Sequence, residues 1–160
     1  MDFLTEFFKK AKAEGVHTNL DTSGNPFTDQ EPWHSGWLEL MKYTDLVMLD
    51  IKQIDEQEHI KLTGHSNKNI LAMARELSDM KKPVWIRHVL VPGGSDKDEY
   101  LHRLADFIHT LSNVERVEVL PYHTLGKFKW ENLGLSYPLE GVNPPTQERI
   151  DNARKILGAI

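Results

Sequence analysis

The segment Asp45-Leu46-Val47-Met48-Leu49-Asp50-Ile51-Lys52 is the clearest strand signal in this 160-residue chain. A run of apolar residues that ends in an acid is typical of a strand buried on both faces of a parallel sheet. Similar stretches stand before and after it, at residues 16–20, 84–91 and 114–120, and segments with helical spacing of apolar residues separate them. Strands that alternate with helices pair in parallel through right-handed crossovers. The sequence therefore predicts an α/β fold with four parallel strands.

The segments between the strands follow the same logic. Apolar residues recur at helical spacing in residues 67–80, behind the turn Pro92-Gly93-Gly94, and from Thr146 onward. Ser95 and Asp98 resemble a capping box, and Thr146 is the expected cap of the last helix. Residues 124–145 are rich in Gly, Pro and aromatics and predict an ordered loop. No linker interrupts the chain, so we predict a single domain, residues 1–160.

The net charge, the cysteine content and the length of the apolar runs exclude several classes of protein. The formal net charge of −5 argues against binding to nucleic acid or to anionic membranes. The chain has no cysteine, which excludes a disulfide, a thiolate metal site and a cysteine nucleophile within it. No apolar run approaches the ~18 residues of a membrane span, and the first residues lack the apolar stretch of a signal peptide. We therefore expect a cytoplasmic protein that binds neither nucleic acid nor membrane.

Polar side chains stand at or near the end of each predicted strand. The carboxyl ends of parallel strands form one rim, where loops and helix N-termini converge and ligands bind. Carboxylates, a lysine and a histidine on one rim suit a zwitterion or a cation. The residues concerned are Asp21, Thr22, Asp50, Lys52, Arg87, His88 and His123.

Asp50 and Lys52 are the most informative pair, because residues two apart on a strand face the same side. They either neutralise each other or hold the amino and carboxylate ends of an amino-acid moiety. Lys52 also fits the Schiff-base lysine of an aldolase-like enzyme, and Asp50 fits the phosphoacceptor of a receiver-like signalling module. Arg87 stands in mid-strand, so it needs a carboxylate partner or a substrate if it points inward.

Four blocks of this sequence resemble consecutive blocks of the activating enzymes of pyruvate formate-lyase, a family of glycyl-radical-enzyme activases. They are Leu20–Gly24, Asp45–Lys52, Val84–Gly93 and Leu120–Lys127, and their order and spacing agree along essentially the whole chain. The resemblance implies the later part of a partial (β/α)6 barrel of the TIM type. An activase of another glycyl-radical enzyme is the alternative within the same chemistry.

The resemblance also implies radical S-adenosylmethionine chemistry. In that family a four-iron four-sulfur (4Fe–4S) cluster, held by a Cys-x3-Cys-x2-Cys loop, reductively cleaves S-adenosylmethionine. The resulting 5′-deoxyadenosyl radical abstracts hydrogen from a glycine of the partner, here pyruvate formate-lyase, and a flavodoxin-type protein is the expected reductant. Carried over residue by residue, the resemblance implies that S-adenosylmethionine lies against Asp50, Ile51, Lys52 and His123.

Two further roles follow from the same resemblance. Asp21, Thr22 and Asp50, with the carbonyl of Met48, resemble the family's monovalent-cation site beside the cofactor carboxylate. Arg87 matches a residue near the incoming glycine loop of the partner protein.

The chain departs from the family pattern because it lacks the cysteine loop and the first two strands of the barrel. It therefore contains no iron–sulfur ligand. We expect a C-terminal fragment, truncated by design or by proteolysis, that is inactive by itself. The uncovered edge of its first strand predicts self-association.

Overall fold

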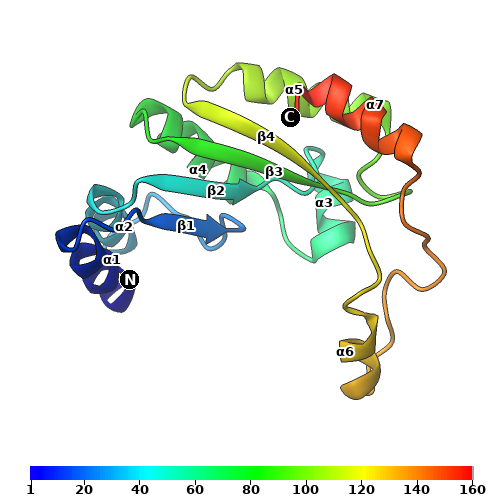
Figure 1. Cartoon of the computed structure of the whole chain (residues 1–160), viewed down its shortest axis with the longest axis horizontal. Coiled ribbons are helices and arrows are strands. Elements are labelled where there is room, and N and C mark those ends of the chain that lie inside the picture. Colours follow the sequence, from blue (N-terminus) through cyan, green and yellow to red (C-terminus); the bar gives the residue numbers. More distant parts are fainter. Residues whose placement is uncertain (160) are drawn as a thin grey trace.

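The computed structural model describes residues 1–159 and shows a curved sheet of four parallel strands (Figure 1). The sheet order is β1-β2-β3-β4, and each pair of neighbours is parallel. The predicted α/β fold with four parallel strands is confirmed. The strands are β1 (Asn19–Thr22), β2 (Leu46–Asp50), β3 (Val84–Leu90) and β4 (Val114–Pro121).

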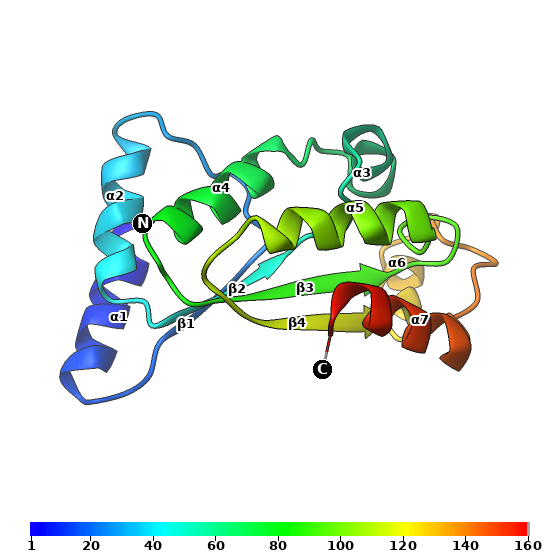
Figure 2. The same cartoon turned by 90° about the horizontal axis from the view of Figure 1, so that it is seen from above.

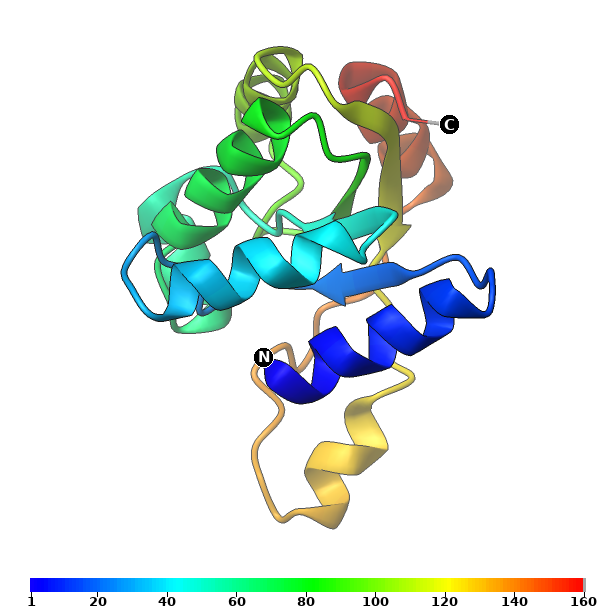
Figure 3. The ribbon, with the colours of Figure 1, turned by 90° about the vertical axis from the view of Figure 1, so that its left-hand side faces the viewer.

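Helices separate the strands and cover one side of the sheet. Seen from above, α3, α4 and α5 lie along one side of the strands (Figure 2), and seen end-on, α2, α4, α5 and α7 follow the outside of the curve (Figure 3). The helices are α1 (Asp2–Ala13), α2 (Trp33–Lys42), α3 (Glu56–Thr63), α4 (Lys68–Asp79), α5 (Asp98–His109), α6 (Lys127–Asn132) and α7 (Gln147–Leu157). Among the described residues, no helix has both the length and the apolar character needed to cross a bilayer.

The two faces of the sheet differ in chemistry. Val84, Ile86, His88 and Leu90 are buried along β3, and the residues between them are half-buried, as expected when successive side chains point to opposite faces. We call the less buried face the concave face. From the strand register, its residues include Asn19, Asp21, Leu46, Met48, Asp50, Trp85, Arg87, Val89, Arg116, Glu118 and Leu120.

The prediction that the Leu46–Leu49 run is buried on both faces was wrong for one of its residues. Val47 and Leu49 are fully buried, whereas Met48 is half-buried on the concave face. Its register partners there are Asp21 and Trp85. Met48 therefore lies among polar and amphipathic side chains rather than in a second apolar layer.

The predicted capping box of the helix after Gly94 was also wrong. Helix α5 begins after Lys97 without a side-chain cap, and Ser95 is fully buried. The Ser95 hydroxyl donates to the carbonyl of Val89 at 2.6 Å and accepts from the amide of Val91 at 2.9 Å. These two bonds hold the turn against the end of β3. They also satisfy the hydroxyl, as expected for a buried polar group.

Two helices were not expected from the sequence. Helix α6 lies inside the predicted loop 124–145, and α3 follows β2 directly. The signals for α3 were present: Asp55 accepts hydrogen bonds from the amides of Gln57 and Glu58, and Gly64 ends the helix in the left-handed conformation. The cap of the last helix is confirmed, since Thr146 accepts from the amide of Arg149.

Candidate functional site

Arg87 connects three strands on the concave face. From β3, its Nε donates to Oδ1 of Asp50 on β2 at 2.9 Å, and its Nη1 donates to Oδ2 of Asp21 on β1 at 3.0 Å. Nη2 contacts both carboxylates as well. The Arg87 side chain is 15% exposed and Asp50 is 16% exposed, so this is a partly buried ion pair. Of the two alternatives for Arg87, a carboxylate partner or a substrate, the structure shows the carboxylate partner.

The charge of Arg87 is stabilised by this arrangement. Burial alone would lower the pKa of the guanidinium, but the hydrogen bonds and charges of Asp21 and Asp50 outweigh it and raise that pKa. Arg87 therefore remains a cation between two carboxylates.

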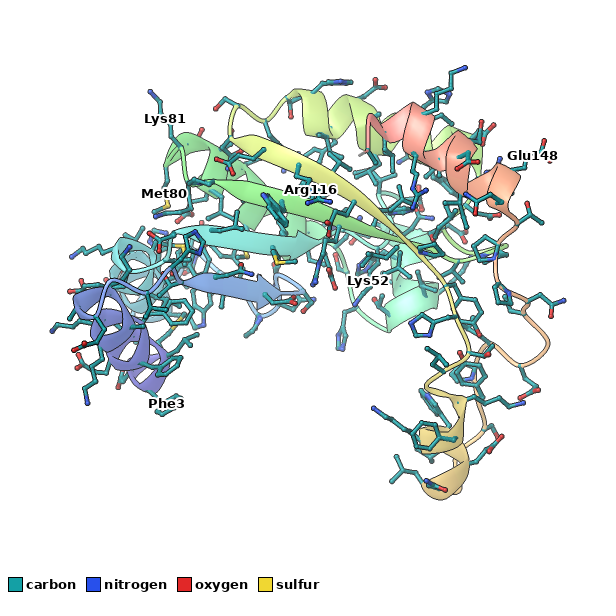
Figure 4. The ribbon with its side chains drawn as sticks, in the orientation of Figure 1. Phe3, Lys52, Met80, Lys81, Arg116 and Glu148 are labelled. Atoms are coloured by element: carbon teal, nitrogen blue, oxygen red, sulfur yellow. The ribbon has the colours of Figure 1, made fainter. Side chains whose placement is uncertain are left out.

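Lys52 completes the charged cluster. Its Nζ lies 3.5 Å from Oδ2 of Asp50, and its side chain is 36% exposed. Figure 4 places Lys52 beyond the end of β2, beside α3. Asp50 therefore uses one oxygen for Arg87 and the other for Lys52. We call Asp21, Asp50, Lys52 and Arg87 the rim cluster; its two carboxylates and two cations balance in charge.

A cavity of about 300 Å³ opens beside the rim cluster. Its walls come from the loop after β1, the end of β2, helix α3 and the start of α4. Its lining includes hydroxyl, amide, imidazole, carboxylate and ammonium groups. The lining residues are Ser23, Asn25, Asp50, Lys52, His59, Thr63, His65 and Ile70.

His59 is a residue that the sequence reasoning missed. It is 2% exposed, lies on α3 and lines this cavity. Without a prediction of α3, nothing placed His59 near Lys52. Two sequence signals could have revealed it: Asp55 as the N-cap and Gly64 as the C-cap of a helix. Together they place a helix that carries His59 shortly after the Asp50-x-Lys52 motif in the sequence.

Ile51 and His123 stand apart from the rim cluster. Ile51 is fully buried; its amide donates to the carbonyl of Arg87 at 2.9 Å, and its carbonyl lies 2.9 Å from Nδ1 of His88. His123 is exposed after β4, and its Nδ1 accepts from the amide of Leu125 at 3.3 Å. In the neutral ring, Nε2 of His123 is then the protonated nitrogen, free to donate.

The residues expected at a cation site lie next to one another. Asp21 and Met48 are register partners, and Asp50 follows on β2. The Thr22 hydroxyl accepts from the amide of Gly24 at 3.0 Å. Arg87 holds both carboxylates, and in residues 1–159 no group of three or more His, Cys, Asp or Glu side chains is placed to hold a metal ion.

Comparison with known proteins supports the resemblance. No family model matches the chain. It is 55% identical over 157 residues to a pyruvate formate-lyase-activating enzyme of Streptococcus mutans, covering 98% of this chain and 60% of that protein. It is 56% identical over 157 residues to the enzyme of the same name from Staphylococcus epidermidis, covering 98% and 62%. The chain thus spans about 60% of the length of these curated relatives.

Solved structures agree with the fold. A domain of pyruvate-formate lyase-activating enzyme from Bacteroides vulgatus superposes with a TM-score of 0.79 at 22% identity, covering 98% of this chain and 84% of that one. A radical SAM methyltransferase from Sphaerobacter thermophilus superposes with a TM-score of 0.60 at 18% identity, covering 91% and 39%. The predicted later part of a TIM-like barrel is therefore confirmed as the fold class.

Proposed function

We propose that this relative of the pyruvate formate-lyase-activating enzymes forms the later part of such an enzyme's barrel and contributes part of its S-adenosylmethionine site. The proposal rests on the rim cluster, which lies at the carboxyl ends of parallel strands in a chain that aligns with those relatives over 98% of its length. Charged groups of both signs at such a rim are the partners that a zwitterionic ligand needs.

The residues present fit the amino-acid end of S-adenosylmethionine. Lys52 is 36% exposed, so its ammonium can bind a carboxylate. The free lone pairs of Asp50 can accept from an ammonium or a hydroxyl, while Arg87 keeps the carboxylate in place. We propose that Ile51, which is fully buried, supports the ligand site from behind, and that Nε2 of His123 donates a hydrogen bond to the ligand from the end of β4.

The same cluster supports the proposed monovalent-cation site at Asp21, Thr22, Asp50 and the Met48 carbonyl. The guanidinium of Arg87 already lies between the two carboxylates, at 3.0 Å from Asp21 and 2.8 Å from Asp50. This arrangement supports the view that the pair accepts one positive charge. A cation would have to share these oxygens with Arg87 or displace it, which would free Arg87 for a peptide of the partner protein.

The chain does not fit the proposed iron–sulfur cluster, because it has no cysteine and cannot supply a thiolate. We propose that in the whole enzyme bound S-adenosylmethionine and a 4Fe–4S cluster supply the hydrogen-abstracting chemistry. This chain binds and orients the ligand through its rim cluster. Pyruvate formate-lyase as the partner, a flavodoxin-type reductant, a cytoplasmic location and the assignment of residues 1–160 to a single domain belong to the same proposal.

Calorimetric titration of this chain with S-adenosylmethionine tests the binding site. We expect Lys52→Met and Asp50→Asn each to weaken binding by roughly tenfold, the value of about one charge-assisted hydrogen bond. Lys61→Met is the matched control, because Lys61 pairs with Glu58 on the surface of α3 and does not line the cavity. Equal affinity of all three variants, or no binding by the unmodified chain, would overturn the proposal.

A further inference from the structure

His59 has a polar atom that nothing in the described chain satisfies. The residue is 2% exposed, and within residues 1–159 its Nε2 is buried without a hydrogen-bond partner. Buried polar side-chain atoms are paired in the large majority of cases, so each exception calls for a physical explanation. His59 also lines the cavity beside Lys52 and Asp50.

The chemical character of this atom is set by the other ring nitrogen. Nδ1 of His59 lies 2.7 Å from the carbonyl oxygen of His65. A carbonyl can only accept, so Nδ1 carries the proton. The Thr63 hydroxyl, 3.1 Å from Nδ1, donates to the carbonyl of His59 at 2.8 Å. In the neutral ring, Nε2 is therefore an acceptor that requires an N–H or O–H donor.

The ring is also held in place before any ligand arrives. The side-chain amide of Asn67 donates to the carbonyls of Gln53 and Ile54 at 3.0 and 2.8 Å, and Gln53 donates to the carbonyl of Gly94 at 2.8 Å. Asp55 caps the helix that carries His59. These bonds fix the loop between β2 and α3, so the Nε2 lone pair is preorganised.

The cavity that His59 lines also carries groups that complement an acceptor. Lys52 contributes a cation, and Ser23 and Asn25 contribute polar groups from the loop after β1. Water competes poorly for a shielded acceptor, so a donor that enters here forms a stronger bond than it would at the surface.

We infer that His59 is a further ligand-binding residue, whose Nε2 accepts a hydrogen bond from a hydroxyl or amino group of a ligand that also carries an anionic group for Lys52. The inference rests on the proposed function, since it extends the S-adenosylmethionine site along the cavity to α3. The donor is either a ribose hydroxyl or the adenine amino group.

Two substitutions separate ligand binding from folding. Asparagine can keep the donor that His59 offers to the His65 carbonyl but lacks an acceptor at Nε2, whereas glutamine can place an oxygen near Nε2. With S-adenosylmethionine in the calorimeter, we expect His59→Asn to weaken binding about tenfold and His59→Gln to stay within about threefold of the unmodified chain. Urea unfolding of both variants checks that they remain folded.

Ligand analogues identify the donor. The dideoxyribose analogue of S-adenosylmethionine removes the ribose hydroxyls, and the dimethylated adenine analogue removes the amino N–H groups. One of the two analogues should bind the unmodified chain more weakly than S-adenosylmethionine does. The same analogue should bind His59→Asn and the unmodified chain with equal affinity, because the hydrogen bond is already absent, as in a double-mutant cycle. If His59→Asn binds all three compounds as the unmodified chain does, the inference is overturned while the proposed function stands.

Failure of the proposed function gives a different result. If the unmodified chain does not bind S-adenosylmethionine, nitrogen NMR of labelled histidine during titration with adenosine, and separately with methionine, decides the case. A shift of the His59 Nε2 signal with either probe supports the ligand site without the proposed function. No shift with both probes overturns both.

Discussion

Nη1 of Arg87 on β3 donates a hydrogen bond of 3.0 Å to Oδ2 of Asp21 on β1, across the intervening strand β2. Asp50 of β2 is the register partner of Arg87 and accepts from its Nε. One guanidinium therefore joins three strands on the concave face. The arrangement has consequences for stability as well as for binding.

Loss of the Arg87 side chain should destabilise the fold. In Arg87→Leu, the carboxylate of Asp50, 16% exposed, keeps only the longer contact to Lys52. We expect the free energy of unfolding in urea to fall by about 2 kcal/mol, since a buried charged group left without its partner costs more than a neutral one. The control is Arg103→Leu, which removes a more exposed pair with Asp55 and should cost less than about 1 kcal/mol. Equal losses in the two variants would contradict this reading of Arg87.

Removal of the Arg87 charge should also favour cations at the rim. Because Arg87 occupies the oxygens of Asp21 and Asp50, Arg87→Gln should raise the affinity for a monovalent cation by roughly tenfold, or about 1.4 kcal/mol. Sodium NMR of the folded variants measures this affinity. Arg116→Gln, on the same face but paired with Glu118, should leave it unchanged. An unchanged affinity in Arg87→Gln would show that the guanidinium and the cation do not compete.

Stability should depend on pH through His88. Burial lowers the pKa of His88 below its ordinary value of 6.5, so below about that pH the unfolded chain binds a proton that the folded chain does not. Stability therefore falls as the pH decreases from the unfolded pKa towards the folded pKa, by at most about 1.4 kcal/mol per pH unit. Urea midpoints of the unmodified chain should decline in that window, and those of His88→Asn should decline less. His17→Asn, at an exposed position, should follow the unmodified chain; a flat profile in all three would refute the prediction.

Asp45 should contribute stability at neutral pH that acid removes. The ammonium of Lys12 and then the amide of Thr18 hold the pKa of Asp45 down to about 2, from 3.8. The unfolded chain gains its proton first, so this contribution is lost as the pH falls from about 3.8 towards 2. Because both side chains are partly exposed, we expect Asp45→Asn to cost about 1 kcal/mol at pH 7. The cost should shrink steadily as the pH falls from about 3.8 to about 2; a difference that stays constant over this range would have to arise from packing.

The exposed aromatic face of α1 should support the predicted self-association. Phe3 is 84% exposed and Phe7 is 56% exposed, with ring centroids 6.3 Å apart, and Figure 4 shows Phe3 pointing away from the body of the molecule. Light scattering after gel filtration should show association that weakens in Phe3→Ser/Phe7→Ser. Phe128→Ser, at an exposed position on α6, is the control. A monomer at all concentrations would refute the prediction.

The order of the four strands and most of the rim could be predicted from the sequence alone. A run such as Leu46–Asp50 specifies a strand locally, and alternation with helices implies parallel pairing, so Asp21, Asp50 and Lys52 could be placed at one end of the sheet. Local capping chemistry also identified the start of α7 at Thr146. The predicted capping box failed because Ser95 has other partners available. Ser95 is buried next to β3, and its hydroxyl bonds to backbone groups there instead of capping α5.

The contacts between residues on different elements could be found only in the three-dimensional structure. Arg87 and Asp21 are 66 residues apart, and their contact depends on the strand register and on the curvature that brings β1 within reach of β3. His59 became a candidate ligand residue because α3 places it among the residues that line a cavity, and because its buried Nε2 has no partner in the described residues. The physical reason is that periodicity reports which face a residue takes on its own element, while distances between elements depend on how the whole sheet twists and packs.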